Sequence, residues 1–299
     1  MPRKPARAAD WIRSIADDDR PFLLVYSCNE PHHPFVYPDP FVGMYRAEQA
    51  ELPLTLDDPA GPESLTRRYR ATLVPASRYS EEQIRAMSAA YHGGVSFVDH
   101  CAGLIFTALL ETDQYDRTLI IYTSDHGELL GNHGLFFKGS HMHDDMVRVP
   151  LVVRPPGGLA GGRPCDALVS HVDLVPTIAH WCGARTTGLH GQMIGELMQG
   201  ADGAVRDGVS CEYHSGLWQV PISPLRMWRT PEWKYVESRG GDHELYDLRS
   251  DPNELRNLLA DAASATALGQ MRHALGQWLA SVGDPWPEVP VPPPRPPAA

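Results

Sequence analysis

The stretch at residues 118–150, TLIIYTSDHGELLGNHGLFFKGSHMHDDMVRVP, organises the rest of the chain. Its first seven residues are almost wholly apolar and rich in β-branched side chains, which predicts a short strand buried on both faces of a parallel sheet. Polar, ionisable side chains follow at once, beginning with Asp125 and His126. Ligands of open α/β sheets bind where strands end. The stretch therefore predicts a site at the carboxyl end of this strand.

Three side chains in the stretch have the chemistry of a hydrolytic site. Asp125 offers a hard anionic oxygen and His126 an imidazole nitrogen, and both could bind one divalent cation. Lys138 lies in a loop beside Gly139, where its ammonium group could contact an anionic ester. A simpler interpretation makes Asp125 and His126 a turn cap and Lys138 a solvated loop lysine. We favour the site, and we expect its other half elsewhere in the chain.

Composition limits the classes of function. The 299 residues carry a formal net charge of −11 and show no basic patch, which argues against a nucleic-acid partner. Five scattered cysteines without a CxxC pair predict neither a disulfide framework nor a structural zinc site. No apolar run in the first 30 residues is long enough for a signal sequence or a membrane span. We expect a cytoplasmic protein without a membrane partner.

The pattern along the chain alternates strands and helices. Residues 22–28 read as a strand that leads into the turn containing His32, so polar groups again gather where a strand ends. His32 alone would more simply be a turn histidine between prolines. Residues 80–110 carry apolar side chains at steps of three or four, which predicts a long helix with Ser80 at its start. Residues 151–154 read as another strand.

Composition changes near residue 200. We predict a layered α/β domain over residues 1–200 and an antiparallel α+β subdomain over residues 201–282. The subdomain would hold short aromatic strands at residues 231–236 and 244–248, a helix that begins at residues 251–254, and another over residues 264–279. Residues 283–299 read as a proline-rich tail that cannot form a core.

Taken together, these motifs resemble the sulfatase family of the alkaline-phosphatase-like superfamily, in the family's own order. The resemblance rests on the PHHP turn with His32, the SDHG motif at residues 124–127, Lys138-Gly139, and RVPL at residues 148–151. It continues through VDLVPT at residues 172–177, RMWRTPEWKYV at residues 226–236 and ELYDLRSDPNELRNL at residues 244–258. The resemblance implies an alkaline-phosphatase-like α/β fold and hydrolysis of small-molecule sulfate esters.

The resemblance also assigns roles to residues. Asp125 and His126 would be metal ligands, with calcium the expected ion and magnesium or manganese as alternatives. His32 and Lys138 would bind the sulfate group, and His133 would line the substrate pocket. We expect His32, Asp125, His126 and Lys138 to converge on one pocket. His141, His143, Asp144 and Asp145 read either as the rim of that pocket or as a small transition-metal site.

One departure from the family limits the predicted activity. Sulfatases carry a C-x-P-x-R or S-x-A-x-R segment whose Cys or Ser becomes the formylglycine nucleophile, and a first strand ending in paired aspartates. Neither occurs here. We therefore expect an N-terminally incomplete sulfatase that is inactive as this chain alone. Alternatives are a non-catalytic remnant that binds an anion or metal, and a hydrolase of phosphodiesters or phosphonate monoesters. A homo-oligomer, or completion by the missing segment, remains open.

Overall fold

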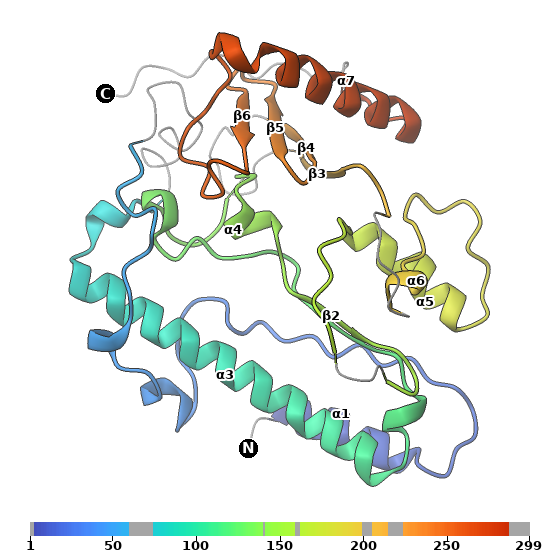
Figure 1. Ribbon diagram of the computed structural model, residues 1–299. Helices are drawn as coiled ribbons and strands as arrows, with labels where there is room; N and C mark the ends of the chain where they lie inside the picture. The colour runs from blue at the N-terminus through green and yellow to red at the C-terminus, as the bar shows by residue number, and fades with distance from the viewer. Residues whose placement is uncertain are drawn as a thin grey trace. The chain divides into compact units, whose positions relative to one another are not determined.

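The structure is a computed structural model (Figure 1). The described residues are 3–59, 74–139, 141–158, 162–198, 205–214 and 224–286. The chain folds as two compact units, and each is described by itself. The first comprises Met1–Pro53, Ala76–Tyr122 and Leu151–Gly161, and the second comprises Leu54–Pro75, Thr123–Pro150 and Gly162–Ala299. This division differs from the predicted boundary at residue 200, which stays a prediction.

The first unit is built on one long helix, α3 (Glu81–Glu111), which confirms the helix predicted at residues 80–110. Ser80 starts it with a capping box, in which its side chain accepts from the Gln83 amide and the Gln83 side chain accepts from the Ser80 amide. Helix α1 (Arg3–Ser14) packs along α3 (Figure 1). Short 3-10 turns complete the unit at Phe41–Gly43, Ala47–Gln49, Ala76–Arg78 and Tyr115–Arg117.

Helix α3 is long and apolar enough to cross a membrane by length and composition alone. Its apolar residues, however, form the core of the first unit. Ile105, Ala108 and Leu109 pack with Ala9 and Ile12 of α1 in one cluster. A second cluster is formed by Tyr37, Phe97 and Cys101. Packing inside the unit therefore covers part of the apolar surface of α3.

The first unit also holds a two-stranded sheet of β1 (Ile120–Thr123) and β2 (Leu151–Arg154), at the positions predicted from the sequence. β1 was expected to be buried on both faces, and this is wrong, because Tyr122 and Thr123 are exposed. Residues 22–28 were expected to form a strand, but the structure assigns none there. They run as an extended segment whose alternate side chains, Phe22, Leu24 and Tyr26, pack on the α1–α3 cluster.

The second unit contains an antiparallel sheet in the order β3-β4-β5-β6, covered by the last helix, α7 (Figure 1). Leu225 of β4 pairs with Ser238 of β5, and Trp233 of β5 pairs with Asp247 of β6. The bounds of the strands and of α7 are β3 Val209–Tyr213, β4 Leu225–Arg229, β5 Trp233–Ser238, β6 Glu244–Asp247 and α7 Ala265–Val282. The predicted antiparallel sheet and the helix near residues 264–279 are thus both present.

Two details of this region correct the sequence analysis. Residues 251–259 form turns rather than a helix: the Asp251 carboxylate accepts from the Leu255 and Arg256 amides as a cap would, but no helix follows. Trp286 was assigned to the tail, yet it is buried in the cluster between the sheet and α7. The packed part of the chain therefore extends beyond residue 282, while residues 287–299 of the predicted tail lie outside the described residues.

The rest of the second unit consists of short elements. Helix α5 (Leu174–Trp181) follows a 3-10 turn at His171–Asp173, as the VDLVPT motif predicted. The fully buried Asp173 carboxylate accepts from the Ser170 and Gln192 amides and pairs with Arg206. The remaining elements are the helices α4 Asp144–Val147 and α6 Gly195–Met198 and the 3-10 turns Asn132–Gly134 and Ala262–Ser264.

Candidate functional site

The Asp125–His126 pair lies where β1 ends, in a turn fixed by backbone contacts. The Asp125 carboxylate accepts from the His126 amide at 3.0 Å, and the Gly127 amide donates to the Met146 carbonyl at 2.9 Å. A Cβ on Gly127 would lie 1.8 Å from the Asp145 carbonyl oxygen. Only glycine fits this approach, so residue 127 holds the SDHG turn against the segment that contains Asp145.

The side chains of Asp125 and His126 have an arrangement suited to one cation. Nδ1 of His126 lies 2.8 Å from the Gly127 carbonyl oxygen, which can only accept, so Nδ1 carries the proton. In the neutral ring Nε2 keeps its lone pair, and it lies 3.7 Å from Oδ2 of Asp125. Metal-binding histidines typically donate their second ring N–H to a carbonyl or carboxylate in this way. The Asp125 side chain is 86% exposed and accessible to an ion.

This pair offers only two protein ligands. Within the described part of the chain, no three His, Cys, Asp or Glu side chains gather in a way that could hold a metal ion. Calcium takes six to eight oxygen ligands. The residues fit a divalent cation as part of a coordination shell, and the remaining positions would be filled by water or substrate oxygens.

Glu128 ties the SDHG turn to the segment that carries Lys138. Its carboxylate accepts from the Leu130 amide at 3.0 Å and from the Phe137 amide at 2.6 Å. Burial raises the pKa of Glu128, while these two backbone bonds and the nearby charges of Lys138 and His126 oppose the rise. Glu128 was not among the residues predicted for the site. The signal was its place in the SDHGE run, directly after the predicted metal ligands.

The loop between Glu128 and Lys138 closes on itself. The Leu129 amide donates to the Phe137 carbonyl and the Gly131 amide to the Leu135 carbonyl, at 3.1 and 2.8 Å. Phe137 has a φ of +68°, a left-handed conformation that is uncommon for a bulky side chain. Lys138 follows it, half-buried. The backbone next to Lys138 is thus positioned by hydrogen bonds across the loop.

His133 is buried and lies between two carboxylates. Its side chain is 1% exposed, with Nδ1 3.0 Å from Asp58 and Nε2 3.5 Å from Asp145. Burial alone would lower its pKa, but the hydrogen bonds and charges of Asp145 and Asp58 raise it to about 9. The ring is an imidazolium held between two carboxylates. Both ring nitrogens face protein carboxylates, and the expectation that His133 lines a substrate pocket stays a prediction.

The residues expected at the pocket rim are also buried. His141 and His143 are each 4% exposed, and the ring of His143 stacks on His133 with centroids 3.7 Å apart. Asp144 accepts from Lys234, which is fully buried and lies 2.5 Å from both Asp144 and Glu254. These side chains join the loop segment to the four-stranded sheet. For His141 and His143, the rim interpretation is wrong.

His32 lies in the first unit, whereas Asp125, His126 and Lys138 lie in the second. Its ring is exposed and stacks on His33, with centroids 4.1 Å apart. The second unit already brings Asp125, His126 and Glu128 together with the loop of Lys138. The convergence of His32 with them in one pocket stays a prediction.

Comparison with known proteins gives these residues a family context. The sulfatase family profile matches residues 6–184, and the profile of the N-sulphoglucosamine sulphohydrolase C-terminal region matches residues 131–280. The chain is 33% identical to the uncharacterized sulfatase YidJ of Escherichia coli, over 94% of this chain and 55% of that protein. It is 30% identical to the multifunctional alkaline phosphatase superfamily protein PehA of Trinickia caryophylli, covering 89% of this chain and 57% of PehA.

Solved structures show the same fold. The phosphonate monoester hydrolase of Agrobacterium radiobacter superposes with a TM-score of 0.80 at 28% identity, over 92% of this chain and 60% of that one. A protein of Bacteroides thetaiotaomicron superposes with a TM-score of 0.82 at 24% identity, over 96% of this chain and 65% of that one. The predicted alkaline-phosphatase-like α/β fold is confirmed. The chain spans about half the length of the curated relatives it matches.

Proposed function

The chain belongs to the sulfatase family, and from this premise we propose that its 299 residues bind and polarise a sulfate ester in a metal-dependent hydrolase. The observation that carries the proposal is the Asp125–His126 geometry. The proton on Nδ1 of His126 is engaged by a carbonyl, and Nε2 and the Asp125 carboxylate lie 3.7 Å apart at an exposed position. These residues would hold a divalent cation, with calcium the expected ion.

Each remaining group has one task in this proposal. A bound divalent cation would stabilise negative charge that develops on the ester oxygens. Lys138 would donate to a sulfate oxygen from the loop that Glu128 fixes, and His32 would contribute a second donor from the first unit. Glu128 acts through the backbone at Phe137 and so positions Lys138 without contacting substrate.

The attacking group is a separate question. The formylglycine route needs a Cys or Ser within C-x-P-x-R or S-x-A-x-R, and none of Cys28, Cys101, Cys165, Cys182 and Cys211 has that context. Under that mechanism, these residues supply binding and polarisation but no nucleophile. We expect the 299-residue chain to bind ligands of the site without appreciable turnover of an aryl sulfate.

Calcium titration by isothermal calorimetry tests the metal site directly. Two protein ligands predict a weak site, with a Kd of about 10⁻³ M. Asp125→Asn should weaken binding at least about tenfold, because it removes the only anionic ligand of the pair. The matched control is Asp166→Asn, at another exposed aspartate of the second unit. Calcium binding that is equal in both variants would contradict the assignment.

A second candidate function is hydrolysis of phosphonate monoesters. It is favoured by the likeness to the Agrobacterium enzyme, at 28% identity and a TM-score of 0.80. Sulfate and phosphonate monoesters both place anionic oxygens beside Lys138 and the cation, so the described residues suit either. Competition between inorganic sulfate and methylphosphonate for the calcium-loaded chain, measured by calorimetry, would rank the two classes. Loss of both in Lys138→Met, with calcium binding intact, would place the anion at Lys138.

A further inference from the structure

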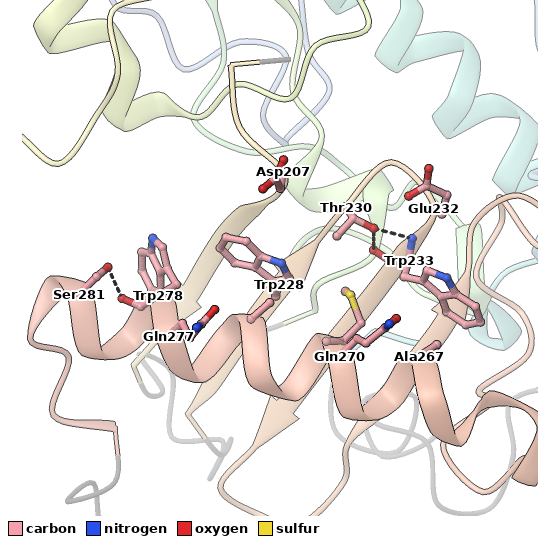
Figure 2. Close-up of a pocket in the computed structure, with 12 residues that line it drawn as sticks. Asp207, Trp228, Thr230, Glu232, Trp233, Ala267, Gln270, Gln277, Trp278 and Ser281 are labelled. Carbon is pink, nitrogen blue, oxygen red and sulfur yellow. Dashed lines mark hydrogen bonds between the residues drawn. The ribbon is translucent and has the colours of Figure 1, made fainter. Parts of the chain in front are cut away.

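A groove of about 550 Å³ runs along α7 in the second unit, and neither Asp125 nor Lys138 is among the residues that line it (Figure 2). Three tryptophans line it: Trp228 of β4, Trp233 of β5 and Trp278 of α7. The rings of Trp228 and Trp278 have centroids 6.5 Å apart. All three side chains are partly exposed, with their inner parts packed on the buried cluster between α7 and the sheet.

The helix side of the groove is a single stripe of α7. Figure 2 shows Ala267, Gln270, Gln277, Trp278 and Ser281 of this stripe along the helix. Ala267 and Ala274 are small and leave room, while Gln270 and Gln277 present amide groups to the groove. The two alanines are seven residues apart, about 10.5 Å along the helix axis. Small side chains and amide groups thus alternate along the stripe.

The charge of the groove is negative. The carboxylates of Asp207 and Glu232 lie at its edge, and no Lys or Arg occurs among the described residues that line it. Arg249 approaches the Trp233 ring to 5.9 Å, but it is paired with Asp247. An aromatic surface with uncompensated carboxylates selects a ligand that carries apolar rings and positive charge.

The chain itself contains such a ligand. Residues 287–299 read PEVPVPPPRPPAA, with seven prolines, one acidic side chain, Glu288, next to the anchored end, and one basic side chain, Arg295, in the distal half. A polyproline II helix has three residues per turn, so prolines at residues 287, 290, 293 and 296 would share one edge. Proline-rich segments in this conformation bind grooves lined by aromatic side chains. We propose that residues 287–299 dock into the tryptophan groove of their own chain, with Arg295 against Glu232 or Asp207.

The lengths are compatible with docking in cis. From Ser281 to Ala267 the groove follows about 21 Å of α7, whereas thirteen residues of polyproline II span about 40 Å. Trp286, the residue before the segment, is buried in the cluster beneath α7. About half of the segment would span the distance from Trp286 to the groove, and the other half would lie in the groove. One polyproline II turn, about 9.3 Å, also approximates the spacing of the two alanines.

A neutral saccharide could also stack on exposed tryptophans, but the tail is favoured for two reasons. Its arginine complements the two carboxylates, which a neutral sugar does not. A tethered ligand also has an effective concentration in about the millimolar range, so an intrinsic Kd below about 1 mM keeps the groove mostly filled. The covered groove would shield three tryptophans from other partners.

The test uses the full chain carrying, at its C-terminus, a dye that tryptophan quenches on contact. Arg295→Glu should lower the docking equilibrium constant about threefold, the effect of losing and reversing an exposed ion pair, and dye emission should rise accordingly. Adding Glu232→Arg to Arg295→Glu should restore most of the quenching if Glu232 is the partner, and Asp207→Arg should do so if Asp207 is. Glu196→Arg, at another exposed glutamate of the second unit, should leave emission unchanged.

The outcomes separate the occupants of the groove. Quenching that is independent of protein concentration and follows the charge swaps supports docking in cis. Emission equal to that of the dye on a free tail peptide in every variant would overturn the proposal. Quenching that grows with concentration would also overturn it, since the tail would then bind a second copy. Quenching of intrinsic tryptophan emission by a neutral oligosaccharide, with the dye unquenched, would assign the groove to carbohydrate instead.

Discussion

Residues 21–28 of the first unit and residues 124–138 of the second are organised by opposite means. The first segment has the sequence pattern of a strand, but the structure has no strand there. Its side chains Leu23 and Val25 are 74% and 78% exposed. The second is polar and rich in glycine, yet hydrogen bonds from Glu128, Gly127 and His126 fix its backbone. Apolar side chains fix one face of a segment by packing. The backbone is fixed only where its N–H and C=O groups have hydrogen-bond partners.

The two units also differ in what they bury. The clusters of the first unit are apolar, formed by α1, α3 and the segments that pack on them. The second unit buries Lys234 and Glu254 together with the imidazolium of His133. Buried charges are costly unless paired, so each partner becomes necessary once the other is present. Mutations should therefore affect the second unit more strongly, and the following predictions test that contrast.

The largest effect is expected from Lys234→Met. This substitution leaves Asp144 and Glu254 without their shared cation, which lies 2.5 Å from each. Removing one partner of a buried ionic cluster costs about 3–5 kcal/mol. Chemical denaturation monitored by circular dichroism would measure this loss in the free energy of unfolding. Lys4→Met, in α1 of the first unit, is the matched control and should change stability by less than about 0.5 kcal/mol.

Acid titration gives an independent check on the same cluster. Burial alone would raise the pKa of Glu254, but the charge of Lys234 and the contact with His143 lower it to about 2. A lowered folded pKa means that the carboxylate contributes stability above its unfolded value near 4.5, and that this contribution is lost as pH falls towards 2. Lys234→Met should flatten this part of the stability profile. If stability falls at low pH in Lys234→Met as it does in the unsubstituted chain, Lys234 does not hold Glu254 ionised.

His133 should produce a loss of stability on the alkaline side. Its folded pKa of about 9 lies above the ordinary value of 6.5. The imidazolium therefore contributes stability that is complete below about pH 6.5 and is lost as pH rises through 9, on the order of 3 kcal/mol. Urea unfolding between pH 6 and pH 10 would show the decline. His133→Asn should remove it, because Asn tolerates the left-handed backbone at this position but does not titrate.

The groups that face His133 determine how this result is interpreted. They are Asp58 and Asp145 on the two ring nitrogens and His143, stacked on the ring. Burial lowers the pKa of His143, so it does not titrate over the alkaline range. A decline that persists in His133→Asn would assign the effect to another group and remove the support for a charged His133.

Gly127→Ala should have the next largest effect. The added Cβ would meet the Asp145 carbonyl oxygen at 1.8 Å, and backbone on both sides limits relaxation. Overpacking of this kind costs about 1–3 kcal/mol. Gly103→Ala in α3, where no atom lies within 4 Å of the new Cβ, should stabilise the chain by about 0.5–1 kcal/mol. Thermal unfolding of the two variants would check that the difference arises from the turn and not from glycine as such.

Much of the fold was predictable because it depends on local patterns. The long helix was signalled by apolar steps of three or four after Ser80, and the C-terminal sheet by short aromatic runs. The strand expected at residues 22–28 was wrong because its pattern specifies a packed face but not a hydrogen-bonding neighbour. The helix expected after Asp251 was wrong because the same cap chemistry also stabilises an isolated turn.

The candidate site was only partly predictable for a similar reason. Asp125 and His126 follow a strand directly, so their proximity is a local property of the chain. Asp58 lies 75 residues before His133, and no pattern in the sequence connects them. The motif around His133 therefore indicated a pocket histidine, whereas its ring is buried between carboxylates. Pairing across such distances is set by tertiary packing.

The smallest effect is expected at the exposed face of residues 21–28. It tests whether this segment is packed on one face only. Leu23→Thr and Val25→Thr replace side chains that are mostly exposed, so each should change the free energy of unfolding by less than about 0.5 kcal/mol. Leu24→Ala, the matched control, removes a side chain packed on the α1–α3 cluster and should cost about 2 kcal/mol. Denaturation of the three variants at one protein concentration would measure the alternation directly. If Leu23→Thr costs as much as Leu24→Ala, the outer face is covered in solution and residues 22–28 lie inside a layered sheet, as their sequence pattern predicted.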